Sequence, residues 1–382
     1  MKILIGADIV PTSNNLSFFC EGSVNDIVDE EVIRVMNTYD YRVCNLETPL
    51  CDKETPIDKC GANHISPTII ARRLREFPID LCALANNHIM DQGAEGLLST
   101  MKTLTENNVG YCGVGNNLNE ARKIFTFRLN DEAVGVFNCA EHEFSIAGED
   151  TSGACPYDPL YVFDYISDKK QDVDYLIVLY HGGKEYYQYP SPQLQRTCRR
   201  FVEKGADLVI CQHSHCIGCE EKYGNGTIVY GQGNFIFYDE SNQLGKNSIL
   251  IGVDTLDNTI LYYPITYSEK VSLSDDDEAK KVLSEFTKRS NRATDSDFLK
   301  SEYERFAIDK SWDYFRSLMG KPGRGFLYRV ANKLTRGKFN KYMIKRRYDK
   351  NSILTVLNYV KCEAHNELII KGLEEHSETV GK

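Results

Sequence analysis

The sequence predicts an α/β protein with a layered core and a C-terminal helical appendage. Through the first two-thirds of the 382 residues, β-branched apolar runs alternate with helix-like runs, and this alternation is typical of α/β layers. Three strand-like runs in series, at 227–238, 248–254 and 259–268, add antiparallel strands at the end of the core. The composition then changes to a charged, helical pattern. We therefore expect a core at 1–270 and a helical appendage at 271–382.

The elements of the core follow from periodicity and from start and stop signals. The apolar run before Pro11 predicts a strand, and Ser66 followed by Pro67 is typical of a helix N-cap and first helical residue. Asn130 and Asp131, between two alternating runs, favour a hairpin. In chain order, strands are expected at 2–10, 41–46, 80–85, 123–129, 132–140, 174–180 and 207–212, and helices at 29–38, 67–77, 94–107, 159–169 and 191–204.

The appendage carries most of the positive charge. An acidic stretch at 274–278 suits the start of a helix, and the helical pattern resumes at Phe326 after a glycine-rich break. Residues 321–350 hold eleven Lys or Arg and one Asp, in a chain whose net charge is −10. This basic segment indicates a polyanionic partner or an anionic membrane surface. The alternative is a solvated helix face that balances acidic neighbours. No nucleic-acid partner is expected.

The bulk composition is that of an ordinary globular protein, with 42% hydrophobic and 26% charged residues. No run approaches the ~20 apolar residues of a membrane-spanning helix. The apolar run at the N-terminus is too short for a signal peptide. We therefore expect a cytoplasmic protein, or one that is peripheral at the inner face of the membrane.

The thirteen cysteines are expected to be reduced thiols, because most of them fall inside predicted strands or helices. Cys216 and Cys219 form a Cys-x-x-Cys sequence. A zinc knuckle would need a second pair of ligands at a fitting spacing, and the sequence offers none. We interpret this pair as incidental rather than as a metal or redox motif.

Polar side chains that can bind metals stand at the ends of several predicted strands. Alone, each is weak evidence, since Asp and Asn favour turns and caps. Together they form a mixed oxygen and nitrogen set that suits one or two divalent transition metals such as Mn, Fe or Zn. We expect them on the same side of one parallel sheet, where such sheets bind ligands. The candidates are Asp8, Asn45, Glu47, Asn87, His181, His213 and His215.

Other polar residues lie beside this set. Asp91 follows His88 by three residues, so it is either a carboxylate that orients the imidazole or the N-cap of the next helix. Lys184 and Glu185 lie just after His181 and are candidates for substrate contact. Asn234 ends another predicted strand and is a candidate to line the pocket. His64, in a loop before a helix, is expected to be structural.

The sequence resembles the CapA family, whose members are linked to bacterial capsule and poly-γ-glutamate synthesis. The resemblance covers about residues 1–265, with a weaker echo near the C-terminus. It rests on six motifs in order: ADIVPT, NLETPL, ANNHIMDQG, YHGGKEY, GADLVICQHSH and YGQGNFIF. The fold of this family resembles the calcineurin-like metallophosphoesterases, so the resemblance implies an α/β/β/α layered core.

The metallophosphoesterase pattern implies a role for each matching residue. It makes His88 the general acid. The implied ligands are Asp8 and His215 for metal 1, Asn87, His181 and His213 for metal 2, and Glu47, or less favourably Asn45, as the bridge between them. The wider superfamily has a His two residues after the first Asp, where this chain has Val10. Because valine cannot bind a metal, metal 1 is expected to bind weakly or to be missing.

The resemblance implies a metal-dependent hydrolase or transferase in surface-polymer biosynthesis. Its substrate would be the surface polymer or a phosphorylated precursor of it. The rival hypothesis is a non-catalytic assembly factor that keeps the fold and holds polymer-synthesis proteins through its helical appendage. The retained His88 favours the enzyme, and Val10 favours the rival.

Overall fold

The structure is a computed structural model that describes the chain except for residues 130, 239–242, 321–324, 363–364, 371 and 374–382. The chain divides into two compact units, unit 1 at Met1–Tyr303 and unit 2 at Glu304–Lys382. The boundary therefore falls well after residue 270, where the composition changes. Helix α8 (Asp276–Ser290) belongs to unit 1, where Phe286 packs against Tyr262.

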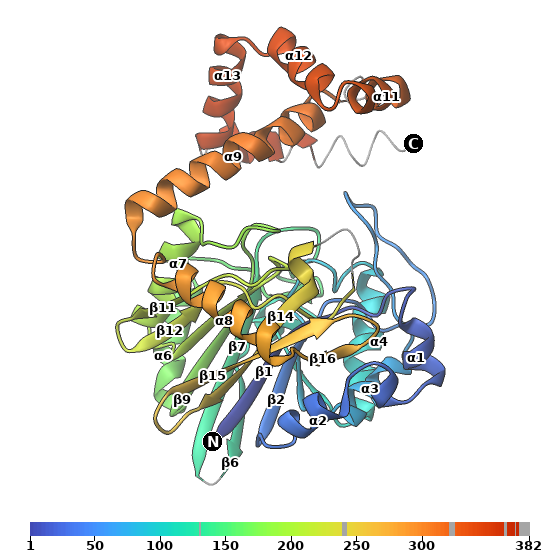
Figure 1. The fold of residues 1–382 in the computed structure, drawn as a ribbon, viewed down its shortest axis with the longest axis vertical. Helices are drawn as coiled ribbons and strands as arrows, with labels where there is room; N and C mark the ends of the chain where they lie inside the picture. The colour runs from blue at the N-terminus through green and yellow to red at the C-terminus, as the bar shows by residue number, and fades with distance from the viewer. Residues whose placement is uncertain (130, 239–242, 321–324, 363–364, 371, 374–382) are drawn as a thin grey trace. The chain divides into compact units, whose positions relative to one another are not determined.

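Unit 1 is built on two sheets (Figure 1). The first has the strand order β16-β15-β14-β1-β2-β3-β4, with β13 also paired to β1. Its strands are β1 (Lys2–Ile9), β2 (Tyr41–Leu46), β3 (Leu81–Ala83), β4 (Gly110–Cys112), β13 (Asn234–Ile236), β14 (Asn247–Asp254), β15 (Thr259–Tyr267) and β16 (Val271–Leu273). β1 runs parallel to β2 and β13 but antiparallel to β14, so this sheet is mixed.

The second sheet has the order β11-β12-β10-β9-β7-β6. Its strands are β6 (Phe125–Leu129), β7 (Glu132–Ala140), β9 (Tyr175–His181), β10 (Leu208–Gln212), β11 (Glu220–Tyr223) and β12 (Gly226–Val229). β7, β9, β10 and β12 are parallel neighbours, and β6 and β11 are antiparallel edge strands. The short strands β5 (Val114–Gly115) and β8 (Gly153–Ala154) pair separately.

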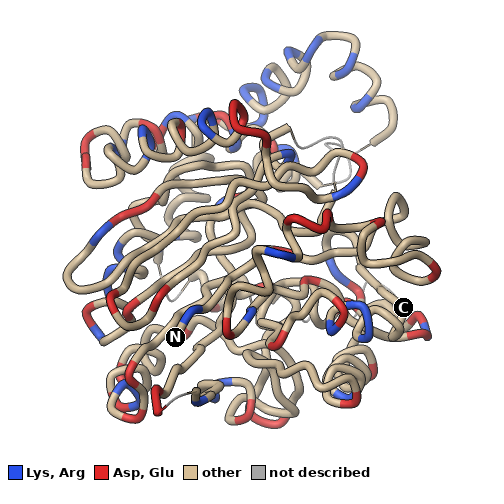
Figure 2. The backbone as a smooth tube through the Cα atoms, turned by 60° about the horizontal axis from the view of Figure 1, so that its bottom comes forward, with Lys and Arg blue, Asp and Glu red and all other residues tan. Residues whose placement is uncertain are grey.

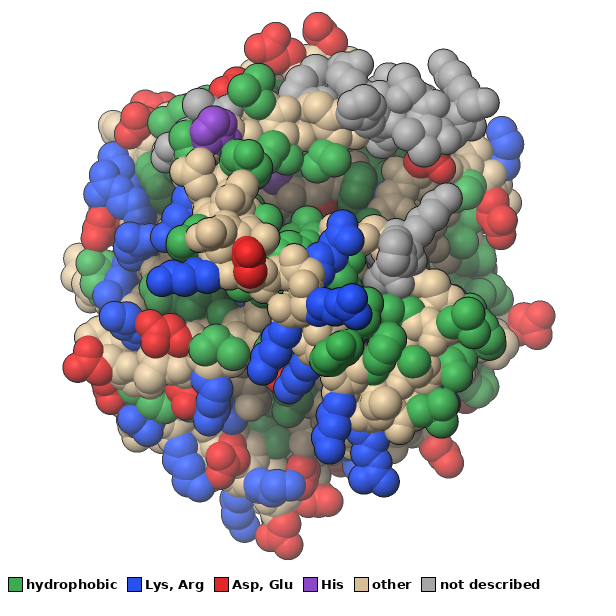
Figure 3. Space-filling model, turned by 90° about the horizontal axis from the view of Figure 1, so that it is seen from above, with side chains coloured by type: hydrophobic (Ala, Val, Ile, Leu, Met, Phe, Trp, Pro, Cys, Tyr) green, Lys and Arg blue, Asp and Glu red, His purple; other side chains and the backbone are tan. Residues whose placement is uncertain are grey.

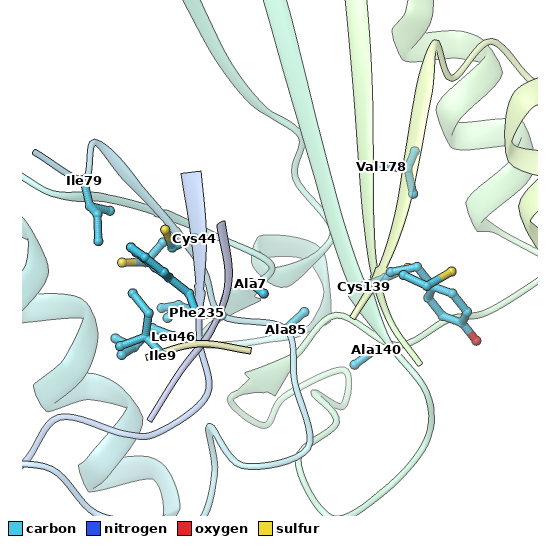
Figure 4. Packing of buried hydrophobic residues seen from close by; sticks show 14 of the residues in the cluster. Ala7, Ile9, Cys44, Leu46, Ile79, Ala85, Cys139, Ala140, Val178 and Phe235 are labelled. Atoms are coloured by element: carbon cyan, nitrogen blue, oxygen red, sulfur yellow. The ribbon is translucent and has the colours of Figure 1, made fainter. Parts of the chain in front are cut away.

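Alternation of side chains along the strands places the core in layers. Ile3, Ile5 and Val43 of the first sheet share one buried cluster with Ile177 and Leu179 of the second, so this cluster fills the space between the sheets. The opposite faces pack against helices and form a second cluster, parts of which are drawn in Figure 4. The helices are α1 (Leu16–Glu21), α2 (Glu30–Met36), α3 (Ile70–Glu76), α4 (Gly93–Glu106), α6 (Val162–Lys169) and α7 (Pro192–Glu203), with the short α5 (Leu118–Ala121) beside β5. The expected α/β/β/α layering is confirmed.

Three expectations about elements are wrong. Helix α3 begins at Ile70, not at Pro67, because Ser66 is held in an isolated β-bridge with Leu50. The run 227–238 is two strands, since Gly231 and Gly233 both adopt positive φ between them. The strand ends that carry the candidate ligands also belong to two sheets rather than to one parallel sheet.

Unit 2 is helical. It contains most of α9 (Ser296–Leu318), then α11 (Phe326–Leu334), α12 (Lys338–Arg347) and α13 (Lys350–Lys361). Its small core joins Met319, Tyr328 and Ile344, with Trp312 and Phe315 packed around them. Among the described residues, no helix is both long and apolar enough to cross a membrane. All thirteen cysteines are free, and both Cys216 and Cys219 are buried.

Candidate metal centre

The candidate ligands converge at the carboxyl ends of strands from both sheets. Asp8 at the end of β1 lies beside Asn45 of β2 on one side and Asn234 of β13 on the other. In the second sheet, His181 ends β9 and pairs with Gln212, the last residue of β10. His213 therefore follows directly at the same edge. Parallel strands bring their carboxyl ends to one edge, so the two sheets together supply a single site.

One part of the site is built around Asp8, which is fully buried. The Asn45 side chain donates a hydrogen bond to Oδ1 of Asp8 at 2.8 Å. Nδ1 of His215 lies 3.4 Å from Oδ2 of Asp8 and 2.9 Å from Oδ1 of Asn234. The oxygen of Asn45 accepts a hydrogen bond from Asn86, so both ends of its amide are engaged within the protein. The geometry therefore suits Asn45 as a residue that orients Asp8.

The second part is built around His181. Its Nε2 lies 2.9 Å from Oδ1 of Asn87 and 3.3 Å from Oε1 of Glu47, so three potential ligand atoms converge. Ligand atoms of Glu47, His213 and His215 also lie within 4.8 Å of one another. Glu47 is common to both sets. This position suits a carboxylate that bridges two metal ions or that belongs to one.

Several buried polar atoms of the site lack hydrogen bonds within the described part of the chain: both carboxylate oxygens of Glu47, Oδ2 of Asp8 and Nδ1 of His213. Glu47 is fully buried. A buried charge without a partner is costly, and an unsatisfied buried polar atom needs an explanation. The donor set consists of carboxylates, an amide oxygen and imidazoles, as divalent transition metals prefer. The residues present therefore fit a metal ion.

The electrostatics of the site point the same way. Burial alone would raise the pKa of Glu47, but neighbouring His181, then His215, hold it well below its usual range. Burial, and then the charge of His181, lowers the pKa of His213 well below normal. Burial would also lower the pKa of His215, but the nearby carboxylates of Asp8 and Glu47 raise it to about 10. Glu47 is therefore ionised and His213 neutral, the forms that bind metals, whereas His215 is protonated without an ion and would release its proton when a metal binds.

The loop after β10 adopts an uncommon backbone. His213 and His215 have φ values of 82° and 51°, in the left-handed region that non-glycine residues rarely occupy. Such conformations cost on the order of 1–3 kcal/mol each and are often found at functional sites. Ser214 lies between these two left-handed residues. The sharp bends of the backbone bring both imidazoles to the same cluster.

A second polar group stands next to the candidate ligands and contains the candidate general acid. Nδ1 of His88 donates a hydrogen bond to Oδ2 of Asp91 at 2.6 Å. Oδ1 of Asp91 accepts from Lys59, and its Oδ2 accepts from the backbone N–H of His64 at 2.6 Å. The N-cap of α4 is Gln92, so Asp91 does not cap this helix. Asp91 therefore orients the ring of His88 through Nδ1.

Lys59 is the residue that the sequence reasoning missed. Its side chain is only 3% exposed, and its ammonium group lies 3.3 Å from Nδ1 of His88 in addition to its contact with Asp91. The ring of His64 packs on that of His88 with centroids 4.0 Å apart. The sequence places Lys59 in an irregular loop far from Asp91, so no periodicity could have linked the two.

The remaining candidates lie at different distances from the chemistry. Asn234 is in the cluster through His215. Lys184 is half-buried and Glu185 is exposed, and neither makes a side-chain hydrogen bond to another described residue. Val10 is 2% exposed, just after β1, where the resemblance calls for a histidine.

Comparison with known proteins gives a family. Residues 4–239 match the sequence family described as "Bacterial capsule synthesis protein PGA_cap". A capsule biosynthesis protein CapA from Bacillus anthracis is 30% identical over 242 residues, which cover 61% of this chain and 59% of that protein. A PGA biosynthesis protein CapA from Bacillus subtilis (strain 168) is 26% identical over 278 residues, 70% of this chain and 73% of that protein. A solved phosphatase structure from Mycoplasma pneumoniae aligns with 74% of this chain and 96% of its own, at a TM-score of 0.44 and 13% identity.

Proposed function

The chain belongs to the bacterial capsule synthesis protein PGA_cap family, and we propose that it acts in the biosynthesis of a surface polymer, capsular polysaccharide or poly-γ-glutamate. Its activity would be that of a metal-dependent, phosphoesterase-like hydrolase or transferase. The observation that carries this proposal is the buried Glu47, whose oxygens lack hydrogen bonds among the described residues while His181, His213 and His215 surround it. The substrate would be the polymer or a phosphorylated precursor of it.

The ligands divide into two sets that share Glu47. In the proposal, Asp8 and His215 hold one ion, and Asn87, His181 and His213 hold the other, with Mn, Fe or Zn as the metal. Asn45 would position Asp8 rather than bind metal, because both ends of its amide are already hydrogen-bonded. A bound divalent ion would supply an activated water and charge stabilisation for the phosphoryl oxygens.

The protein's own residues would then move the proton. His88 would donate one from Nε2 to the leaving oxygen, a role that imidazole suits near neutral pH. Asp91 holds Nδ1 and fixes the tautomer and the orientation of the ring. Lys59 balances the charge of Asp91. Asn234, Lys184 and Glu185 remain proposed substrate contacts, of which only Asn234 touches the cluster.

The second candidate function is a non-catalytic assembly factor with one structural metal, which would hold polymer-synthesis proteins through unit 2. Val10 is the observation that favours it. This buried valine lies just after Asp8 and removes a ligand from the first ion. An ion held by fewer protein ligands would bind more weakly, and a single ion cannot clamp both the attacking and the leaving oxygen.

One experiment separates the two functions. Metal content is measured by elemental analysis of the purified protein, and turnover of an aryl phosphodiester is measured on the same sample with added manganese. About two metals per chain, with turnover that His88→Ala abolishes, would support the enzyme. One metal or none, without turnover at any manganese concentration, would reject the enzyme in favour of the assembly factor.

A further inference from the structure

Helix α11 in unit 2 presents its apolar residues outward. Its buried residue is Tyr328, which hydrogen-bonds Asn340 of α12 and packs on Phe339 with ring centroids 5.2 Å apart. The remaining large apolar residues of α11 are exposed. Phe326 is 72% exposed, Leu327 81%, Val330 39% and Leu334 79%. Packing within unit 2 therefore uses the opposite side of this helix.

The exposed residues form one continuous face. At about 100° per residue, Phe326, Val330, Leu334 and Leu327 fall within an arc of about 100°, which we call the apolar arc. Tyr328 points roughly the opposite way. Arg329 and Lys333 lie along one border of the arc. A helix with an exposed apolar stripe bordered by cations has the pattern of helices that lie in a membrane interface.

The surroundings of the apolar arc are strongly cationic. Residues 326–348 hold eight Lys or Arg and no Asp or Glu. The four basic-segment residues 321–324 lie outside the described part of the chain. Acidic residues are spread over much of the rest of the molecule (Figure 2), and Lys and Arg stand beside hydrophobic side chains on the face seen in Figure 3. Only an anionic partner complements this charge.

The combination of charge and exposed apolar area decides which partner fits. A soluble polyanion would be held by the cations alone and would leave Phe326, Leu327 and Leu334 in water. A second copy of the chain would face its own like charges across a two-fold interface, which is repulsive. An anionic lipid surface satisfies both features, because the headgroups attract the cations and the acyl boundary accepts the apolar residues.

We propose that α11 forms a surface that binds anionic membranes. The apolar arc enters the acyl boundary, Arg329 and Lys333 on its border contact the headgroups, and the cations of α12 add to the positive charge that attracts the membrane. This surface would bring the protein to the membrane. Membrane binding by this surface does not depend on the metal site. Vesicle binding is measured without a phosphodiester substrate, and turnover is measured in solution without vesicles, so each proposal can fail on its own.

The test is flotation of the full chain with vesicles of phosphatidylcholine alone or of phosphatidylcholine with phosphatidylglycerol. We expect binding to the anionic vesicles only, weakened by salt. The double variant Arg329→Gln/Lys333→Gln should bind about 30-fold more weakly. Leu327→Asn/Leu334→Asn should weaken binding by at least about tenfold per leucine. Circular dichroism checks that each variant is folded.

Matched controls come from unit 1. Lys281→Gln/Lys288→Gln removes two exposed cations from α8, and Leu160→Asn/Leu256→Asn removes two leucines that are 92% and 81% exposed. Both should bind like the wild type. Failure of the wild-type chain to bind anionic vesicles would overturn the proposal. Leucine variants that bind vesicles normally, with soluble polyglutamate displacing the protein, would also overturn it, because they identify a polyanion as the partner. Leucine variants that turn a dimer into a monomer would overturn it too, because they identify a second copy of the chain as the partner.

Discussion

Replacing Lys59 by Met tests whether its buried ion pair with Asp91 stabilises the polar group beside the candidate metal ligands. Lys59 and Asp91 form an ion pair whose side chains are 3% and 0% exposed. Methionine keeps most of the aliphatic stem but removes the ammonium group. Among the described residues, the buried carboxylate of Asp91 would then keep only the N–H of His64 and the ring of His88 as partners, each at 2.6 Å.

The size of the effect follows from these contacts. Removing one partner of a buried ion pair costs about 3–5 kcal/mol of stability, because the other charge is left buried. Asp91 keeps two hydrogen bonds, so we expect the lower end, about 3 kcal/mol. The matched control is Lys53→Met, since Lys53 pairs with Glu95 at 3.5 Å with both side chains over 70% exposed. Its stability should stay close to that of the wild type.

Urea unfolding followed by circular dichroism measures the loss. The only tryptophan, Trp312, lies in unit 2, so its fluorescence reports that unit separately and should not shift. Bound metal should also be retained, because Lys59 contacts no proposed ligand. The reasoning is refuted if Lys59→Met unfolds at the same urea concentration as the wild type or as Lys53→Met.

Three further predictions concern the site and its supports. His213→Ala should strip bound metal, whereas His88→Ala should retain it and abolish phosphodiester turnover; full metal occupancy in His213→Ala would show that His213 is not a ligand. Burial, and then the charge of His88, lowers the pKa of His64 to about 4. In the unfolded chain this pKa is near 6.5, so the unfolded chain binds more protons than the folded one between these two values. The free energy of unfolding should therefore fall as the pH falls through this window, by at most about 3 kcal/mol. His64→Asn should flatten that dependence in urea titrations at several pH values, and an unchanged slope would contradict the assignment. Gly113→Ala should destabilise unit 1 by about 2 kcal/mol or more, because φ is +82° and the new Cβ would lie 2.2 Å from Oδ1 of Asn138. Gly61→Ala, at φ +98° with open space around the new Cβ, measures the cost of the backbone conformation alone. Equal losses of stability in the two variants would contradict the steric argument.

Local patterns predicted most of the strands well. The run 41–46 is β2 as expected, and the hairpin of β6 and β7 lies where two alternating runs meet. β2 and β7 are mostly buried and β6 is an exposed edge strand, so the local pattern and the tertiary packing agree. The N-cap at Ser66 failed for the opposite reason. Its backbone is recruited by a neighbouring segment 16 residues earlier in the chain, through the bridge to Leu50.

The candidate ligands were predictable as a list but not as an arrangement. Strand-end positions identified Asp8, Glu47 and the histidines, because ligand-type side chains are unusual after apolar runs. The sequence could not show that two sheets share the site, since pairing between distant strands leaves no local signal. Lys59 was missed for the same reason: its partner Asp91 is 32 residues away and in a separate loop.

The construction of the site from two sheets has a consequence for how the protein is made. Its proposed ligands span the chain from Asp8 to His215, with Asn234 on the last strand of the cluster. The ribosome synthesises the residue of the first proposed ligand long before that of the last. A growing chain, or a chain that ends within the second sheet, would therefore carry only part of the ligand set. Metal capture would therefore be a late event that marks completion of both sheets, and abortive fragments would carry no competent centre.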